Sequence, residues 1–407
     1  MNLVIRSRLR QYALLALSAI LVLILITRAA NNWLSYVYAG DPPPKGLKEA
    51  SVLEPNNSEF YFLLAQYYDS YDASVPSNQV YSYYQKALEL SPANFAYWFY
   101  LADSLFMDGK QDDSLLALNQ ATELAPGMVS LRWGAAMLAS KMGDEEAIIS
   151  NIRSVLDNDP QRRYKAYPIL WQSLRNGDKI WKAIPDDALP SYLNFLISTR
   201  RLPQTKLAWH KLSGISEVPE ETFLRYVSFL INENDLQYAK QIWTDRLGAW
   251  QGVWNGSFEK EPLSAGFDWR IRKVDGVNIS RKINPDNGYS LKIEFEGKDH
   301  PDSDILRQVI PVNQNSNYRL ISRMKSSGVT TRNGPFWEII CYGSDRLNVR
   351  TEAVSGTTDW HDVSVSFTTP QGCEYLILRL RQVSNEVNER KISGIVWIDN
   401  VELEQLN

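Results

Sequence analysis

Cysteine is scarce in this 407-residue chain, which contains only Cys341 and Cys373 and no C-x-x-C pair. Two separated thiols exclude the structural zinc and iron–sulfur sites that are built from thiolate clusters. In an oxidising compartment the two residues would be free to form a disulfide, and otherwise they would remain buried thiols. The sequence leaves both states open, because a disulfide needs a Cα separation that only the fold sets.

Histidine and excess charge of one sign are also scarce. His210, His300 and His361 lie in separate segments, and the chain has no H-E-x-x-H pair, G-x-S-x-G turn or glycine-rich phosphate loop. Lys and Arg total 43 against 47 Asp and Glu, which argues against the broad basic surface that binds nucleic acid. The dense acidic segment 298–304 is interpreted as a loop. We therefore predict a protein that is not an enzyme and has no nucleic-acid partner.

A long uncharged run stands near the N-terminus, from Gln11 to Thr27. As a helix it would span about 26 Å, the short end of what crosses a bilayer. Three arginines precede the run and only Arg28 follows closely, so the positive-inside rule places the N-terminus in the cytoplasm. We predict a cytoplasmic segment (1–10) and a transmembrane signal anchor (11–30), with a cleaved signal peptide as the alternative. In a Gram-negative bacterium the anchor would lie in the inner membrane, with the bulk of the chain in the periplasm.

Prolines recur at a nearly constant spacing after the anchor: Pro55, Pro92, Pro126 and Pro160 lie 37, 34 and 34 residues apart. Each follows an apolar helical pattern that proline would end. Small side chains recur at two further places in the period, where they would let paired helices approach closely; they are Ala65, Ala87, Ala102, Ala121, Ala136 and Val155. This pattern resembles the tetratricopeptide repeat, a helical pair of about 34 residues, and we assign residues 44–160 to it.

Residues 161–249 continue the helical pattern without the regular prolines. Two apolar pairs of segments are separated by polar turns, and their second members carry Trp209 and Trp243. We predict divergent helical-hairpin repeats. Stacked repeats form a solenoid with an extended surface for a partner, so we expect the array to bind protein; a mere spacer is the alternative.

The pattern changes after residue 249, where apolar residues begin to occupy every second position between Gly, Pro and Asn turns. This alternation is typical of strands in a β-sandwich. The predicted strands are YSLKIEFEG, YRLISRMKSSG, FWEIICYG, HDVSVSFTTP, EYLILRLRQV and GIVWIDNVELEQ. We therefore predict an all-β jelly roll of eight to ten strands over residues 250–407.

Four segments of this domain carry a resemblance to a known family. NGSFE (255–259), VIPVNQNSNYRL (309–320), TTDWHDVSVSFTTP (357–370) and WIDNVEL (397–403) together resemble the galactose-binding-like sandwiches of carbohydrate-binding modules, in the order that the family uses. On this resemblance, the stretch 255–271 is expected to be the first strand. Many members hold a structural calcium ion, and the resemblance implies Glu259 and Asp399 as its ligands. Asn400 departs from the pattern, since the family often has a second acidic residue there.

A sugar site needs an aromatic face for the pyranose ring and forked donors for its hydroxyls or carboxylates. Strand alternation puts Arg379 and Arg381 on one face of EYLILRLRQV, with leucines on the other. Arg323 shares a face with other cations in the same way, while Trp360 is expected to close the sandwich. Our candidate glycan-binding residues are Trp269, Arg323, Trp337, Arg379 and Arg381. The alternative is an ordinary solvated face whose arginines are neutralised by Asp and Glu.

The complete arrangement of anchor, repeats and sandwich is similar to bacterial repeat proteins associated with exopolysaccharide or O-antigen synthesis and export. The resemblance implies a non-catalytic scaffold whose solenoid binds proteins of that machinery and whose sandwich contacts polysaccharide. One alternative keeps the scaffold but has the sandwich dock protein instead of sugar. The other is a glycan-modifying enzyme whose site has no recognisable motif.

Overall fold

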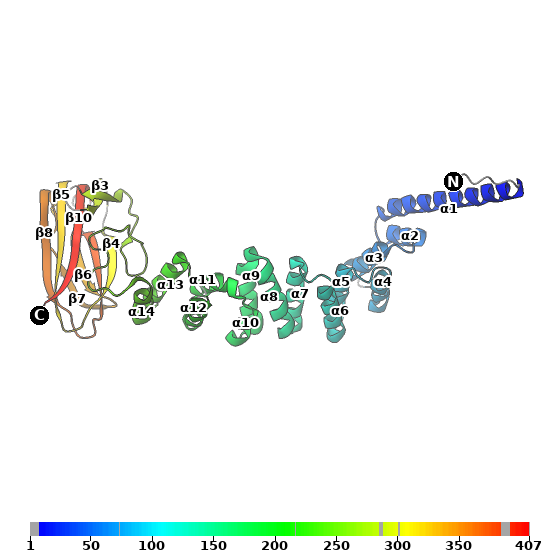
Figure 1. Cartoon of the computed structure of the whole chain (residues 1–407), viewed down its shortest axis with the longest axis horizontal. Helices are drawn as coiled ribbons and strands as arrows, with labels where there is room; N and C mark the ends of the chain where they lie inside the picture. The colour runs from blue at the N-terminus through cyan, green and yellow to red at the C-terminus, as the bar shows by residue number, and fades with distance from the viewer. Residues whose placement is uncertain are drawn as a thin grey trace. The chain divides into compact units, whose positions relative to one another are not determined.

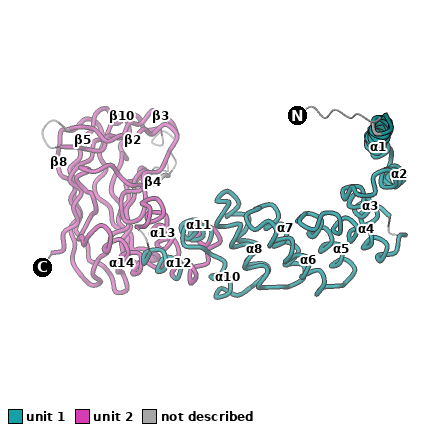
Figure 2. The backbone as a smooth tube through the Cα atoms, turned by 45° about the vertical axis from the view of Figure 1, so that its right-hand side comes forward, with its two compact units in different colours: residues 1–195, 207–215 teal, residues 196–206, 216–407 magenta. Residues whose placement is uncertain are grey.

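The computed structural model describes residues 8–72, 74–215, 217–284, 288–299, 302–383 and 391–406. The chain forms two compact units. Unit 1 comprises residues 1–195 and 207–215, and unit 2 comprises residues 196–206 and 216–407 (Figure 2). His300, and the N-terminal segment up to residue 7, lie outside the described residues.

The chain begins with a long apolar helix, α1 (Arg8–Ala39). Within the described residues only its Gln11–Ala39 portion is long and apolar enough to cross a membrane. At 32 residues the helix is about 48 Å long, which exceeds the apolar thickness of a bilayer. Its end packs on the next helices, where the rings of Tyr36 and Phe60 meet edge to face at 6.0 Å. The N-terminal apolar helix is therefore longer than the predicted anchor 11–30, and its end packs on the first helices of the solenoid.

Antiparallel helical pairs follow in unit 1 (Figure 1). They are α2 (Lys45–Leu53), α3 (Ser58–Tyr71), α4 (Ser77–Leu90), α5 (Phe95–Met107), α6 (Gln111–Leu124), α7 (Val129–Met142), α8 (Glu145–Asn158), η1 (Pro160–Arg162), α9 (Arg163–Leu174), α10 (Gly177–Ala183) and η2 (Asp186–Ala188). The small residues predicted at the close approaches are all fully buried, at 0% exposure. The predicted helical repeats are confirmed.

The repeat reuses the same local chemistry at each helix end. Asn57 and Asn94 cap α3 and α5 by accepting a hydrogen bond from the backbone N–H two residues on, at 3.0 Å in both cases. Such capping satisfies one of the otherwise unpaired N–H groups of the first turn. Gly109 and Gly143 turn the chain between paired helices with φ of 77° and 75°, the left-handed region that favours glycine. The repeated residues therefore determine where a helical hairpin begins and where it turns.

The remaining helices are α11 (Leu189–Ser198) and α12 (Leu202–Ile215), which are divided between the units, and α13 (Glu220–Asn232) and α14 (Leu236–Leu247), which belong to unit 2. Trp243 of α14 is fully buried and lies 5.3 Å from Trp254 and 5.9 Å from Phe267 between ring centroids. The backbone N–H of Gly266 donates to the Ser228 hydroxyl of α13 at 2.8 Å. The last helical pair and the sandwich therefore pack as one body.

Ten strands among the described residues form two antiparallel sheets that pack face to face. Sheet A has the order β1-β4-β9-β6-β7 and sheet B the order β2-β3-β10-β5-β8. The strands are β1 (Arg270–Ile271), β2 (Val277–Asn284), β3 (Gly288–Asp299), β4 (Asp302–Pro311), β5 (Asn317–Val329), β6 (Phe336–Cys341), β7 (Ser344–Arg350), β8 (Gly356–Thr368), β9 (Tyr375–Val383) and β10 (Lys391–Leu406). The predicted β-sandwich and its six strands are confirmed. The interpretation of the acidic segment 298–304 as a loop is wrong for its described residues, because 298–299 belong to β3 and 302–304 to β4.

The stretch 255–271 is not the first strand that the resemblance implied. Only its last two residues, β1, pair with a neighbouring strand. Asn255 closes a loop before them, because its side-chain amide donates to the Lys260 carbonyl at 2.8 Å and accepts from the Lys260 N–H at 3.1 Å. Side-chain bonds of this kind compete with strand pairing.

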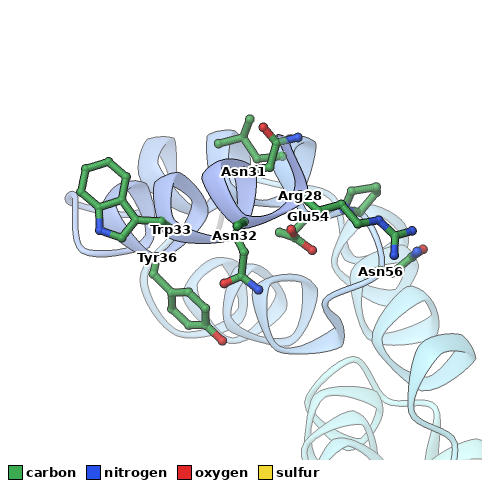
Figure 3. A pocket seen from close by; sticks show the side chains of 10 residues that line it. Arg28, Asn31, Asn32, Trp33, Tyr36, Glu54 and Asn56 are labelled. Atoms are coloured by element: carbon green, nitrogen blue, oxygen red, sulfur yellow. The ribbon is translucent and has the colours of Figure 1, made fainter. Parts of the chain in front are cut away.

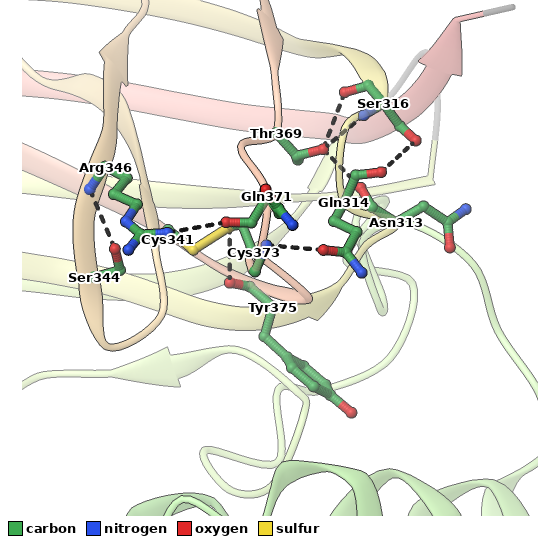
Figure 4. Close-up of a disulfide and its surroundings, with 11 residues drawn as sticks. Asn313, Gln314, Ser316, Cys341, Ser344, Arg346, Thr369, Gln371, Cys373 and Tyr375 are labelled. Atoms are coloured by element: carbon green, nitrogen blue, oxygen red, sulfur yellow. Dashed lines mark hydrogen bonds between the residues drawn. A yellow bond between two sulfur atoms is a disulfide. The ribbon is translucent and has the colours of Figure 1, made fainter.

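Cys341 and Cys373 are joined by a disulfide between β6 and the turn that precedes β9, with a Cα separation of 5.8 Å (Figure 4). This decides between the two states that the sequence left open. Both residues are buried in the sandwich core, and the bond closes a segment with a sequence separation of 32.

Replacing both cysteines by serine is expected to lower the free energy of unfolding of unit 2 by about 3 kcal/mol, because a cross-link of this span restricts the unfolded chain. Urea unfolding of the double variant and of the reduced wild-type chain provides the measurement. The two should lose similar stability. An unfolding midpoint unchanged by reduction would show that the bond does not stabilise the sandwich.

Candidate functional site

Two of the predicted sugar-stacking residues lie in the sandwich core. Trp269 and Trp337 are each 0% exposed, and their rings contact each other with centroids 5.6 Å apart. Trp269 also stacks on Phe258 at 5.5 Å and donates its indole N–H to the Asn255 carbonyl at 3.0 Å. Neither ring has a face available to a sugar, so the prediction of stacking platforms at these two positions is wrong.

Trp360 does not close the sandwich either. It is half-buried on β8, and the guanidinium of Arg323 on β5 lies 5.7 Å from its ring centroid. The core side of these strands is formed by other residues, including Leu320 and Met324, both 0% exposed. Arg323 therefore lies on the outer face of sheet B, as predicted, where an aromatic ring already occupies one side of its guanidinium.

The outer face of sheet A carries a row of charged side chains at matching positions on its five strands. Successive Cα partners in this row are Arg270, Arg307, Arg379, Glu338 and Arg350. Strand alternation places this row opposite the core, because the flanking Leu378 and Leu380 of β9 are buried at 1% and 0% exposure. Four positive groups and one negative group thus cross a single face.

The two arginines predicted from the sequence are held in an ion-pair network. Glu338, 6% exposed, accepts from Arg379 Nε at 2.5 Å and from Arg381 Nη1 at 2.7 Å. Asp304 Oδ1 lies 3.3 Å from Arg379 Nη1 and 3.6 Å from Arg381 Nε. Arg379 and Arg381 do lie on one face as predicted, but carboxylates from β4 and β6 neutralise them. The alternative prediction, a sheet face whose arginines are neutralised by Asp and Glu, therefore describes Arg379 and Arg381 better than a pair of guanidinium groups free to bind sugar.

The sequence interpretation missed the arginines at the edge of the same face. Arg270 is half-buried, and its Nε and Nη2 atoms are shielded from solvent with no hydrogen-bond partner in the described part of the chain. It borders a cavity of about 320 Å³ lined by Arg270, Ile271, Arg272, Asp304 and Arg307. Burial lowers the pKa of the Arg270 guanidinium, and the nearby charge of Arg307 lowers it further. Arg270 and Arg272 alternate in WRIRK, the same signal that identified Arg379 and Arg381.

The predicted calcium ligands are each occupied by backbone amides. Glu259 Oε1 accepts from the Tyr289 N–H at 2.9 Å, and Asp399 Oδ1 accepts from the Asn400 N–H at 2.8 Å. The described residues contain no group of three or more His, Cys, Asp or Glu side chains suited to a metal ion. Calcium takes six to eight oxygen ligands, so Glu259 and Asp399 do not make a calcium site by themselves. Calcium binding stays a prediction.

A second feature lies where α1 meets the first repeats (Figure 3). A cavity of about 850 Å³ is lined by residues including Arg28, Trp33, Tyr36 and Glu54. Arginine beside tryptophan and tyrosine is typical of the membrane–water interface. Arg28, Trp33 and Tyr36 would therefore suit the membrane surface, which is where they would lie if α1 spans the membrane.

Comparison with models of known families agrees with the helical repeats. A model of the tetratricopeptide repeat matches residues 83–115, which confirms the repeat prediction there. A search of curated protein sequences finds no match.

The solved structures to which the chain is similar at low identity include the following three. MamA protein is 14% identical with a TM-score of 0.31, over 47% of this chain and 98% of MamA. A CBM4 structure is 16% identical with a TM-score of 0.29, over 38% of this chain and 99% of the other. The bacteriophage CBA120 tailspike protein 4 domain is 13% identical with a TM-score of 0.29, over 38% of this chain and only 21% of the tailspike domain. At these scores the likenesses carry no argument about function.

Proposed function

We propose that this chain is a non-catalytic scaffold anchored in the bacterial inner membrane, with its bulk in the periplasm, where it serves polysaccharide assembly or export. Its tetratricopeptide-type solenoid binds proteins of that machinery, since repeats of this kind present an extended surface to partners. Its sandwich contacts the polysaccharide. The observation that carries the glycan contact is the row of arginines across the outer face of sheet A, of which Arg307 and Arg350 are exposed.

Two further observations support the compartment. The apolar part of α1 is long enough to span a bilayer, and arginine excess before it favours a cytoplasmic N-terminus. The Cys341–Cys373 disulfide suits an oxidising compartment such as the periplasm. Both support a sandwich on the side of the membrane where exported polysaccharide is found.

Calorimetric titration of the full chain in lipid nanodiscs against the producing cell's own polysaccharide tests the glycan contact. We expect saturable binding that weakens as salt rises, because the contact face is cationic. Polymer length, measured before and after incubation, should not change. No binding by the folded chain would overturn the glycan contact in favour of protein docking, and shortened polymer would show an enzyme.

A further inference from the structure

The guanidinium of Arg270 is partly buried without a hydrogen-bond partner for all of its nitrogens among the described residues. Two of its nitrogens, Nε and Nη2, are out of reach of solvent and have no hydrogen-bond partner within the described ranges. A buried charged group without a partner is strongly unfavourable. Opposite it, on the neighbouring strand, lies Arg307, and like charges facing each other across a strand pair are destabilising as well. An anion in the cavity that both arginines line would offset both unfavourable interactions through its charge.

Among the residues that the structure describes, the carboxylates near Arg270 are already paired. Glu338 is bound by Arg379 and Arg381, and Asp304 lies within ion-pair distance of the same two arginines. Arg272 and Arg307 are exposed and form no ion pair among the residues that the structure describes. Three positive charges at the cavity are therefore left for a ligand after the internal pairs are counted.

The cavity has the size and chemistry of a small binding site. Its volume of about 320 Å³ lies at the low end of the range for small-molecule sites. Ile271 adds an apolar part to the lining, and Asp304 adds a carboxylate. A carboxylate offers about four acceptor positions, so Asp304 can accept from a sugar hydroxyl while it pairs with the two arginines.

We propose that this cavity binds the carboxylate of one acidic sugar residue, a uronic acid, within the polysaccharide. Arg307 and Arg272, whose side chains are exposed, hold the carboxylate through the forked geometry that guanidinium and carboxylate share. Arg270 adds positive charge from the wall of the cavity, and Asp304 accepts a hydroxyl of the same sugar. This inference rests on the proposed function, because it names the chemical class of the glycan and moves the contact from Arg379 and Arg381 to the edge of the sheet.

The test uses the full chain in nanodiscs and a panel of oligouronates (glucuronate, galacturonate and mannuronate). Each is compared with its own carboxyl-reduced form, which keeps the ring and linkage but loses the charge. We expect at least one oligouronate to bind about tenfold or more tightly than its reduced form. Arg270→Gln should weaken that preference, while the exposed Arg319→Gln on sheet B, a matched loss of one charge, should keep it.

Thermal unfolding shows that a loss of binding is not a loss of fold. Because Arg270 leaves no internal partner behind, Arg270→Gln should melt no lower than the wild-type chain without ligand. A preference for oligouronates that Arg270→Gln leaves intact would overturn the inference, as would equal binding of charged and reduced forms. In either case binding of the cell's own polysaccharide would leave the proposed function standing, whereas no binding of any glycan would overturn both.

Discussion

Replacing Glu338 with glutamine is expected to lower the free energy of unfolding of unit 2 by about 2–4 kcal/mol. The carboxylate lies on β6 at 6% exposure and binds Arg379 and Arg381 at the same time. Glutamine keeps the size of the side chain but removes its charge, so both guanidinium groups lose their main partner in a partly buried place. Chemical denaturation followed by tryptophan fluorescence provides the measurement.

The matched control is Glu294→Gln on sheet B. Glu294 pairs with Lys292 at 2.6 Å, but its side chain is 42% exposed, and exposed pairs contribute little. We expect a loss below about 1 kcal/mol. Equal losses of unfolding free energy for Glu338→Gln and Glu294→Gln would contradict the conclusion that the ion-pair network around Glu338 stabilises the sandwich. A quadruple variant with apolar residues at 304, 338, 379 and 381 should recover stability, since apolar replacements of whole buried ion networks are often neutral or stabilising.

Replacing Trp243 with alanine is expected to lower the free energy of unfolding by about 3–5 kcal/mol and to loosen the helical pair from the sandwich. Its fully buried ring contacts Trp250 and Trp254, with centroids 6.3 and 5.3 Å away. Gly266 lies against the same ring, so closely that an added Cβ would come within 2.2 Å of it. The indole therefore fills the joint between α14 and the sandwich. Limited proteolysis should then cut the chain between α14 and β1.

Leu247→Ala in the same helix is the control for this variant. Leu247 is 41% exposed, so its truncation should change stability by less than about 1 kcal/mol and leave the protease pattern as in the wild type. If Trp243→Ala behaved like Leu247→Ala, the helical pair and the sandwich would be independent bodies.

The solenoid could be predicted because its signals are local and periodic. Proline and small residues repeat every 34 residues or so, and the helices end and approach each other at those places. The strands of the sandwich could be predicted equally well, since the alternation of apolar and polar residues shows which side of a strand is buried. By the same rule Trp337 falls on the buried side, between Phe336 and Glu338 in FWEII. Its residue type suggested a platform for sugar stacking at Trp337, but strand alternation places this side chain in the core, where it is 0% exposed.

The ionic partners on sheet A could not be predicted from one sequence. Arg379 meets Glu338 and Asp304 across sequence separations of 41 and 75 residues, and only the strand order brings these side chains together. The pairing of Arg270 with Arg307 depends equally on β1 lying beside β4. Sequence alternation identified charged faces, whereas the topology decided which charges are neutralised and which are left for a ligand.

The most direct test of a glycan-facing scaffold is photo-cross-linking in living producing cells. A photoreactive phenylalanine analogue replaces Lys273, the exposed neighbour of Arg272, in the full-length chain. We predict that light joins the protein to polysaccharide, detected as sugar that remains on the purified chain after denaturation. The same analogue at Arg319 on sheet B should give little sugar. Cross-links to protein alone at Lys273 would contradict the account and assign this face of the sandwich to protein docking.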